Sequence, residues 1–392
     1  MSTLSNSICT AFMLAFLVLM PMRALSQPSS SYKYSPPAKL NDGIDVSSLK
    51  AAKLDEAKIV AGTNEILKGT YPNIHSLLIF RHGKLVYENY FKGDDYERGV
   101  GPLGVVTHTR ETLHDMRSVT KSVVAIAVLK ALSQRKIKSL DQPIFEIFPE
   151  YSRHFDGHKK RITIKHLLTM TAGLKWNEDV PGTDPENSEI QMNRSSNPID
   201  YVFSRPSETE PGRVFRYAGG CTQLLAEIVR VKTGQPIDVY AAEHIFRPLG
   251  ITYFKWVRES NGYPSAASGL RLRSRDISKI GQTMMNDGKW KGKRILPEHL
   301  VREAFRPHIR APFPVPDGHV DYGYQIWLPT QIVNGVQVST AEFEGNGGQI
   351  VIFDKTNGLM VAVTAGNYNR RDQAKNSADL FLEIILPAII RP

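Results

Sequence analysis

The chain has 392 residues, of which 41% are hydrophobic and 22% charged, and its formal net charge is +10. This composition is that of a globular protein with one large domain or two intertwined ones, and it excludes a low-complexity or repeat protein. A basic chain can bind nucleic acid or anionic surfaces, but here the basic residues are scattered, and the short clusters at residues 271–275 and 289–294 are interpreted as solvated surface. We therefore expect no nucleic-acid partner.

The first 26 residues differ from the rest of the chain. Residues 8–20 are largely apolar, and the small residues Ala24 and Ser26 precede Gln27. This pattern predicts a secretory signal peptide over residues 1–26, because the apolar run is too short to span a bilayer comfortably. No Lys or Arg precedes the run, so an uncleaved anchor is the alternative. The sequence thus predicts an exported protein, periplasmic or secreted, with no stable membrane span after cleavage.

Regular elements are expected from about residue 48 onward, in one large domain over residues 48–392. The preceding segment, residues 27–47, is rich in Ser, Pro and Tyr, which favours an extended arm. A helical pattern then continues to Leu67. Residues 76–91 alternate in polarity around a turn at Gly83, which predicts a β-hairpin.

The middle of the chain carries mostly helical patterns, with helices expected at residues 119–133, 163–170, 198–204, 221–233, 237–246, 275–286 and 297–305. Strands follow at residues 322–328, 333–339, 349–354 and 359–364, before a C-terminal helix at about 372–385. Strands at both ends predict an α+β fold in which one antiparallel sheet, flanked by helices, is built from residues 48–111 and 311–392. A helical region, about residues 112–310, is inserted between its strands, and we expect the functional cleft between the two.

A Ser-x-x-Lys pair, Ser118 and Lys121, precedes an apolar stretch at residues 123–132. The stretch predicts a helix buried nearly all round, with Ser118 at its N-terminal end. Residues three apart share a helix face, so Lys121 can direct its nitrogen at the Ser118 hydroxyl, while the free amides at the helix start favour an anion there. This pattern is typical of an activated nucleophile. The same spacing also arises by chance, and serine is a common helix cap.

Tyr217 is a second candidate for the site. It follows a turn at residues 211–213 and immediately precedes a predicted helix. A tyrosine near an ammonium group can shift toward phenolate, act as general base for a hydroxyl, and return the proton to a leaving group. The alternative is a half-buried aromatic residue with a packing role.

A third segment, Asn346, Gly347, Gly348 and Gln349, opens a predicted strand. Glycines at this position let the backbone approach a ligand closely, and the Gln349 amide can serve as an oxyanion donor. A bulge or turn explains the glycines equally well.

Taken in chain order, these three segments resemble the serine β-lactamase and penicillin-recognising hydrolase superfamily. The similar branch holds class C β-lactamases, DD-peptidases, esterases and 6-aminohexanoate-dimer hydrolases. The resemblance continues in residues 166–174, 243–251 and 269–276, and it covers about residues 60–385. It implies a β-lactamase/transpeptidase-like fold.

The resemblance also implies an acyl-enzyme mechanism. Ser118 attacks a carbonyl, Lys121 and Tyr217 share the general-base and general-acid roles, and the amides of Ser118 and Gln349 hold the oxyanion. Water then deacylates the enzyme. The predicted function is therefore hydrolysis of a small-molecule ester or amide.

One departure from the superfamily pattern bears on the substrate. The β-lactamases and DD-peptidases usually begin the third motif with Lys, and some esterases with His, whereas Asn346, Gly347 and Gly348 occupy these substrate-binding positions here. The motif therefore lacks the cation that would pair with a substrate carboxylate. This favours an esterase or amidase over a β-lactamase or DD-peptidase, although an arginine elsewhere can still supply the charge. A non-catalytic binding protein of the same fold is the further alternative.

The sequence predicts no metal site and no organic cofactor. His154 and His158 are four residues apart near Asp156, but the segment is polar and lacks a further ligand pattern. We interpret these three residues as surface residues.

Overall fold

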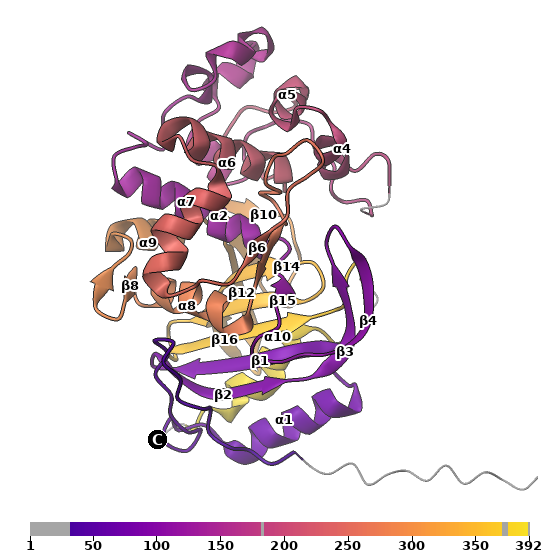
Figure 1. Cartoon of the computed structure of the whole chain (residues 1–392), viewed down its shortest axis with the longest axis vertical. Coiled ribbons are helices and arrows are strands. Elements are labelled where there is room, and N and C mark those ends of the chain that lie inside the picture. Colours follow the sequence, from indigo (N-terminus) through magenta and orange to yellow (C-terminus); the bar gives the residue numbers. More distant parts are fainter. Residues whose placement is uncertain (1–31, 182–183, 371–374, 391–392) are drawn as a thin grey trace, which may run out of the picture. The chain divides into compact units, whose positions relative to one another are not determined.

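A nine-stranded antiparallel sheet forms the centre of the computed structural model, which describes residues 32–181, 184–370 and 375–390. The strand order is β10-β11-β12-β14-β15-β16-β1-β2, with β13 paired to β12 (Figure 1). The strands are β1 (Ile74–Arg81), β2 (Lys84–Tyr90), β10 (Ile309–Ala311), β11 (His319–Tyr322), β12 (Trp327–Val333), β13 (Val336–Ser339), β14 (Ala341–Gly345), β15 (Gln349–Asp354) and β16 (Leu359–Ala365). Strands from both ends of the chain meet where β1 pairs with β16.

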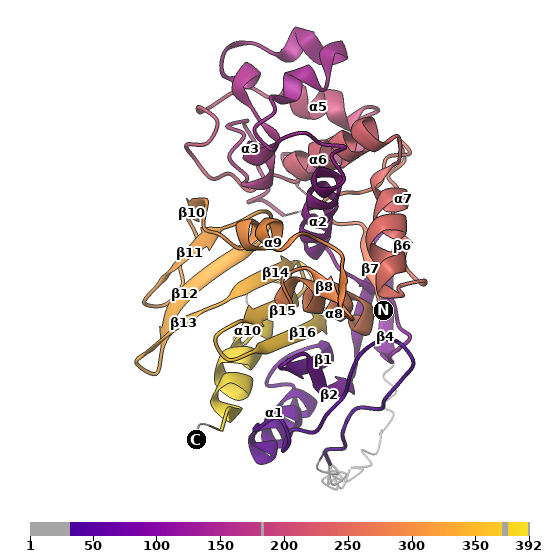
Figure 2. The same cartoon turned by 90° about the vertical axis from the view of Figure 1, so that its left-hand side faces the viewer.

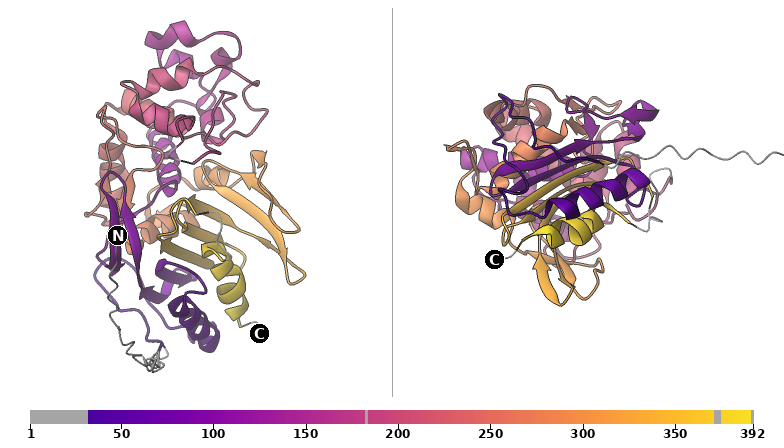
Figure 3. Two further views of the ribbon diagram at one scale, coloured as in Figure 1. Left: turned by 90° about the vertical axis from the view of Figure 1, so that its right-hand side faces the viewer. Right: turned by 90° about the horizontal axis from the view of Figure 1, so that it is seen from below.

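Helices cover both faces of the sheet. All residues of β16 and all but the last of β1 are buried, as expected for strands whose side chains point into apolar layers on both sides. On one face lie α1 (Glu56–Lys68) and the C-terminal segment that starts with α10 (Ser377–Leu380), side by side in Figure 3. On the other face, α8 (Ser274–Met285) contacts β1, β15 and β16.

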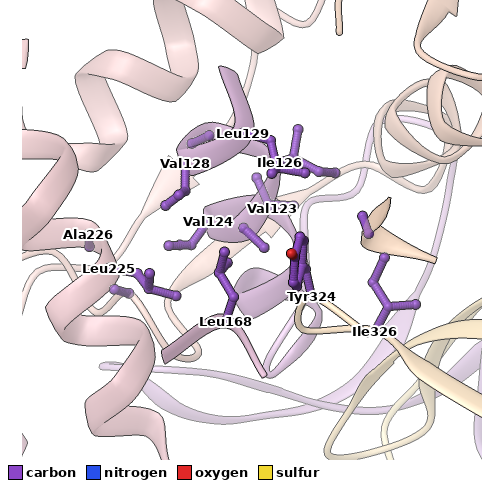
Figure 4. Close-up of a cluster of buried hydrophobic side chains, with 14 of the residues drawn as sticks. Val123, Val124, Ile126, Val128, Leu129, Leu168, Leu225, Ala226, Tyr324 and Ile326 are labelled. Carbon is purple, nitrogen blue, oxygen red and sulfur yellow. The ribbon is translucent and has the colours of Figure 1, made fainter. Parts of the chain in front are cut away.

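The helical region is packed around α2 (Val119–Ser133), which is buried on nearly every side. Its neighbours include α3 (Ile164–Leu168) and α6 (Gly219–Thr233), and Figure 4 shows Val124 beside Leu168 and Leu225. Burying one such large aliphatic side chain contributes roughly 1.5–3 kcal/mol. This cluster therefore fixes the position of the helix that begins just after Ser118.

The other α-helices of the described chain are α4 (Ser188–Arg194), α5 (Pro198–Ser204), α7 (Ile237–Ala241) and α9 (Glu298–Ala304). Three small sheets complete the structure: β3 (Lys92–Glu97) with β4 (Gly101–Thr107), β5 (His114–Asp115) with β7 (Leu270–Leu272) and β6 (Lys255–Trp256), and β8 (Lys289–Trp290) with β9 (Lys293–Arg294). Figure 2 shows α2, α3, α5 and α6 above the large sheet, and β5 leads directly into α2.

The predicted α+β architecture is confirmed, since N-terminal and C-terminal strands share one antiparallel sheet and helical segments lie between them in the sequence. The predicted hairpin at residues 76–91 and the predicted helix at 119–133 are also confirmed. The first residues of the predicted C-terminal helix lie outside the described residues. Strands β3 and β4 were not predicted, because their sequence is rich in Gly and Asp, which are rare in strands.

The strand predicted at residues 322–328 is wrong, because two strands meet there. Strand β11 ends at Tyr322 and β12 begins at Trp327. Between them, the Gly323 amide donates to the Ile326 carbonyl at 2.8 Å, and Gln325 has a φ of 58°. These features form a tight turn that no extended strand can contain.

The predicted signal peptide lies outside the described residues, as does the start of the predicted arm. The described part of the arm lies along β2: the Tyr34 hydroxyl donates to the Val86 carbonyl at 2.8 Å, and the Ser47 amide donates to the Leu85 carbonyl at 2.9 Å. Within the described ranges, no helix combines the length and apolar character needed to cross a bilayer.

Candidate active site

Ser118 lies at the turn that leads from β5 into α2. The preceding residue, Arg117, has a φ of 49°, a conformation that costs a non-glycine residue about 1–3 kcal/mol. The turn is closed by hydrogen bonds from the Val119 amide to the Met116 carbonyl (3.1 Å) and from the Thr120 amide to the Arg117 carbonyl (2.9 Å). The Ser118 hydroxyl makes no capping bond to the helix, so it is available for chemistry.

Lys121 lies one turn into α2 and is only 2% exposed. Its Nζ is 3.1 Å from Ser118 Oγ and 3.0 Å from the carbonyl oxygen of Ala267. The Ala267 carbonyl oxygen can only accept a hydrogen bond, so one N–H of Lys121 points toward it. This contact fixes the position of Nζ next to Ser118 Oγ. The structure thus brings the Ser-x-x-Lys pair to hydrogen-bond distance.

Tyr217 completes this group from the start of α6. Its side chain interacts with that of Ser118, and Lys121 Nζ lies 4.9 Å from the centroid of its ring. The ring stacks on Trp327 with centroids 5.5 Å apart, which fixes its orientation. All three residues predicted to be catalytic are therefore in mutual contact.

The protonation state of Tyr217 differs from the sequence-based expectation of a shift toward phenolate. Burial, reinforced by the charge of Glu178, raises the pKa of Tyr217 well above its usual range, and the hydrogen bond with Ser118 offsets only part of the rise. The resting side chain is therefore a neutral phenol. A phenol in this position can donate a proton.

The glycine-rich segment between β14 and β15 lies against the nucleophile turn. A Cβ on Gly345 would stand 2.4 Å from the Met116 carbonyl oxygen, so only glycine permits this approach of the two backbones. The Gln349 side chain is held within the sheet, where it donates to the Ala365 carbonyl (2.6 Å) and accepts from the Ala365 amide (3.1 Å). Contact between Gln349 and a substrate would therefore involve its backbone.

The three residues before Gln349 have different surroundings. Gly348 lines the cavity described below. Gly347 packs against the ring of Tyr368, and Asn346 is exposed, with its amide donating to Asn369 Oδ1 at 2.7 Å. Of these three, the structure places Gly348 at the cavity, while Asn346 and Gly347 shape the turn.

A cavity of about 640 Å³ opens beside Tyr217 and the start of β15. Its walls combine apolar side chains with five carboxylates, Glu178, Asp179, Glu342, Glu344 and Asp379. The described residues that line it include no Lys or Arg. The cavity is therefore acidic, and it complements a neutral or cationic ligand better than an anionic one.

Glu178 connects the cavity with the catalytic group. Its Oε1 accepts hydrogen bonds from the Trp176 indole and from the first amide of α6. Burial and the charge of Glu189 raise the pKa of Glu178 to about 7, although Lys121 and the hydrogen bonds oppose the rise. Burial would also raise the pKa of Glu189, but nearby cations, Lys121 foremost, lower it, so Glu189 is the ionised member.

Glu342 and Glu344 lie two residues apart on β14 and line the same cavity. The Thr340 hydroxyl donates to Glu342 Oε1 at 2.6 Å. Burial raises the pKa of both carboxyls, and the charge of Glu342 raises that of Glu344 further. Glu344 therefore holds a proton and donates it to Glu342, so that the pair carries one negative charge.

Comparison with known proteins identifies the family. The sequence matches the family model described as Beta-lactamase over residues 75–382. The chain belongs to this family. The superfamily resemblance predicted from the sequence is thereby confirmed, and the family is one of hydrolases that includes esterases and amidases.

Individual known proteins are similar to part of the chain. Esterase EstB of Burkholderia gladioli is 30% identical over 182 residues, 44% of each protein. The 6-aminohexanoate-dimer hydrolase of Paenarthrobacter ureafaciens is 25% identical over 204 residues, 49% of this chain and 50% of that protein. The chain thus spans about half the length of these curated relatives. A family VIII carboxylesterase has the same fold, with a TM-score of 0.65 and 15% identity over 88% of this chain and 99% of that one.

Sequence reasoning missed the acidic residues of the site. Glu178 lies in a loop whose path depends on packing against α6, and no local pattern marks it. The positions of Glu342 and Glu344 could have been recognised in the sequence. The two acidic residues are two apart on one strand, so they share a face, and they lie directly before the glycine-rich turn.

The ionisation of Glu178 predicts a pH dependence of the site. Because its pKa is raised to about 7, we expect kcat/KM for an ester to rise with pH between about 6 and 8. The reason is that ionised Glu178 stabilises a positive charge on Lys121, the interaction that opposes the rise of the Glu178 pKa. A pH–rate profile of Glu178→Gln should lack this ionisation, whereas exposed Glu186→Gln should keep it. Identical profiles for Glu178→Gln and the native chain would contradict this assignment.

Proposed function

We propose that this protein is a serine hydrolase that cleaves an ester or amide bond of a small molecule through an acyl-enzyme on Ser118. The observation that carries the proposal is the 3.1 Å contact between Ser118 Oγ and Lys121 Nζ, with the Tyr217 ring 4.9 Å from the same nitrogen. Membership of a hydrolase family supports it.

The proton movements follow from the contacts. Ser118 Oγ bonds to the carbonyl carbon while its proton passes to the Lys121 amine, which accepts it in the unprotonated form of the side chain. When the bond to the leaving group breaks, the Tyr217 phenol gives its proton to the departing oxygen or nitrogen, and the proton on Lys121 restores the phenol. Attack by water on the acyl-enzyme then releases the acid and returns the proton to Ser118.

The negative charge that develops on the substrate carbonyl oxygen during attack by Ser118 is stabilised by hydrogen-bond donors beside the nucleophile. The Ser118 amide lies at the start of α2, where backbone N–H groups are free of helical partners. The contact of Gly345 with the Met116 carbonyl brings the start of β15, and with it the Gln349 backbone, next to this turn. Two such amides form the proposed oxyanion hole, a device that typically contributes about 3–4 kcal/mol per donor.

The charge of the cavity favours esters or amides with uncharged acyl groups. Penicillins and peptidoglycan peptides carry a carboxylate, which the acidic walls of the cavity repel. Arg117, the arginine next to the nucleophile, is already engaged: its guanidinium is 3.1 Å from Asp115 Oδ2 and lies over the Tyr368 ring at 4.5 Å. We therefore favour esterase or amidase activity over β-lactamase or DD-peptidase activity.

A fluorophosphonate probe tests the acyl-enzyme directly. We expect intact-mass spectrometry to show one adduct on the native chain, with loss of p-nitrophenyl ester hydrolysis, because the probe captures an activated serine. Ser118→Ala should show neither adduct nor hydrolysis. Ser133→Ala, a hydroxyl at the far end of the same helix that donates to the Lys130 carbonyl, is the control and should retain both. If the native chain is not labelled and does not hydrolyse the ester, the proposal is wrong, and the remaining interpretation is a non-catalytic binding protein of this fold.

A further inference from the structure

Four buried side chains with metal-binding groups converge outside the active site. They are His75 on β1, Asp95 on β3, His108 directly after β4, and His114 on β5, with exposed fractions of 0%, 6%, 4% and 2%. One nitrogen or oxygen of each lies within 4.8 Å of the corresponding atoms of the other three. Figure 1 shows the β3–β4 hairpin, whose strand β3 carries Asp95, beside the large sheet.

The outer nitrogens of two imidazoles are held by backbone carbonyls. His108 Nδ1 is 3.0 Å from the Phe91 carbonyl oxygen, and His114 Nδ1 is 3.1 Å from the Asp115 carbonyl oxygen. A carbonyl oxygen can only accept, so each Nδ1 carries a proton. In the neutral rings, the Nε2 atoms therefore present lone pairs to the centre of the cluster.

The third imidazole has the opposite tautomer, but its lone pair also faces inward. His75 Nε2 is 3.2 Å from Asn73 Oδ1, and the Asn73 amide group donates to the Asp94 carbonyl at 2.8 Å, which fixes the oxygen toward the ring. His75 Nε2 therefore carries the proton, and Nδ1 faces the centre. Hydrogen bonds from outer nitrogens to oxygen acceptors are the usual way in which proteins orient metal-binding imidazoles.

The inward groups repel each other unless a positive charge lies between them. His75 Nδ1 and His114 Nε2, both acceptors, are 2.9 Å apart, and His108 Nε2 faces Asp95 Oδ2 at 3.2 Å. A bound cation would relieve the repulsion at neutral pH.

We propose that His75, Asp95, His108 and His114 bind one divalent transition-metal ion, with zinc as the best fit. Three imidazoles and one carboxylate form the four-coordinate set that zinc prefers, whereas magnesium and calcium prefer oxygen ligands. Tetrahedral zinc places its ligand atoms about 3.4 Å apart. The inward atoms are 2.9 and 3.2 Å apart in two pairs, and Asp95 Oδ1 is 3.9 Å from His75 Nδ1 and 3.7 Å from His114 Nε2.

The ion would serve a structural role next to the active site. All four ligands are buried and come from the protein, which is typical of closed structural sites. The metal would join β1, β3 and β5, and β5 continues into the turn that holds Ser118. Asp95 Oδ1 also accepts from the Tyr368 hydroxyl at 3.3 Å, and the Tyr368 ring packs against Gly347. Metal loss should therefore loosen both segments of the active site.

Cobalt binding to the native chain tests the site without relying on activity. Tag-free protein is dialysed against a chelator and titrated with Co²⁺. We expect visible bands of four-coordinate cobalt that saturate at one ion per chain and vanish when Zn²⁺ is added. Zn²⁺, but not Mg²⁺, should raise the Tm of the metal-free protein by about 3 °C or more. Absence of these bands and of any Tm shift would overturn the proposal.

Two variants distinguish this site from metal on surface histidines. His108→Ala should bind less than about a tenth of an ion per chain in elemental analysis, while His319→Ala, which removes a partly exposed histidine of β11, should keep one. Equal metal content in the two variants would overturn the proposal. The cobalt titration needs only the native chain, so it decides the matter even if His108→Ala does not fold. Neither measurement depends on the proposed hydrolase activity.

Discussion

Replacing Lys121 by methionine is expected to lower kcat/KM for a p-nitrophenyl ester about a thousandfold, equivalent to about 4 kcal/mol of transition-state stabilisation. Methionine retains much of the volume of the buried side chain but has no basic nitrogen to accept the proton from Ser118, which is 3.1 Å away in the native site. Tyr217 is a poor substitute, because burial raises its pKa well above the usual range. Initial rates over a range of substrate concentrations measure the effect.

The matched control is Lys130→Met on the same helix. Lys130 is half-buried, and its Nζ donates to the Ile295 carbonyl at 2.8 Å, so it resembles Lys121 in packing but lies far along the helix from Ser118. We expect Lys130→Met to hydrolyse the ester at close to the native rate. Activity of Lys121→Met within tenfold of native would contradict its role as the base, and equal losses in both folded variants would indicate a general effect on the helix.

The core of the site was predictable because it depends on local geometry. Ser118 and Lys121 are three residues apart, so they meet whenever the segment is helical, and the apolar run from residue 123 shows that it is. The contact of Tyr217 with this pair is not local. It was predictable only through the resemblance to a family in which three separate segments recur in the same order.

The electrostatics of the site could not be predicted from the sequence. The protonation of Tyr217 depends on burial by Trp327 and on the charge of Glu178, which lie 110 residues after it and 39 before it in the chain. A nearby ammonium group alone would lower the pKa of Tyr217. Burial in the folded protein raises it instead. The acidic character of the cavity has the same origin, since its carboxylates come from three separate segments.

The metal-type cluster was missed for a related reason. Metal motifs are recognised when ligands recur at short, fixed spacings, and the sequence offered His154 and His158 instead. In the structure His154 pairs with Asp200 at 2.8 Å. The proposed ligands run from residue 75 to residue 114, and they converge only because β3 and β4 fold back beside β1. The β3–β4 hairpin has weak strand propensity, so no sequence pattern predicted it.

The free energy of unfolding of Glu344→Gln is expected to exceed that of the native chain by about 1–3 kcal/mol at pH 8 and to equal it at pH 4.5. The pKa of Glu344 is raised in the folded state by burial and by Glu342. Above the ordinary carboxyl pKa the unfolded chain releases this proton while the folded chain retains it, so the native protein loses stability as pH rises. Glutamine keeps an N–H donor for Glu342 but has no proton to lose.

Chemical unfolding at pH 4.5, 6 and 8 measures this difference, and exposed Glu150→Gln is the control that should match the native chain at each pH. Glu178, whose pKa is also raised, contributes to the native pH dependence but is common to all three proteins, so it cancels in the comparison. A Glu344→Gln variant less stable than the native chain at pH 8 would show that Glu344 is ionised and paired in the folded state. The cavity would then carry an additional negative charge, and neutral acyl groups would lose part of their advantage over cationic substrates.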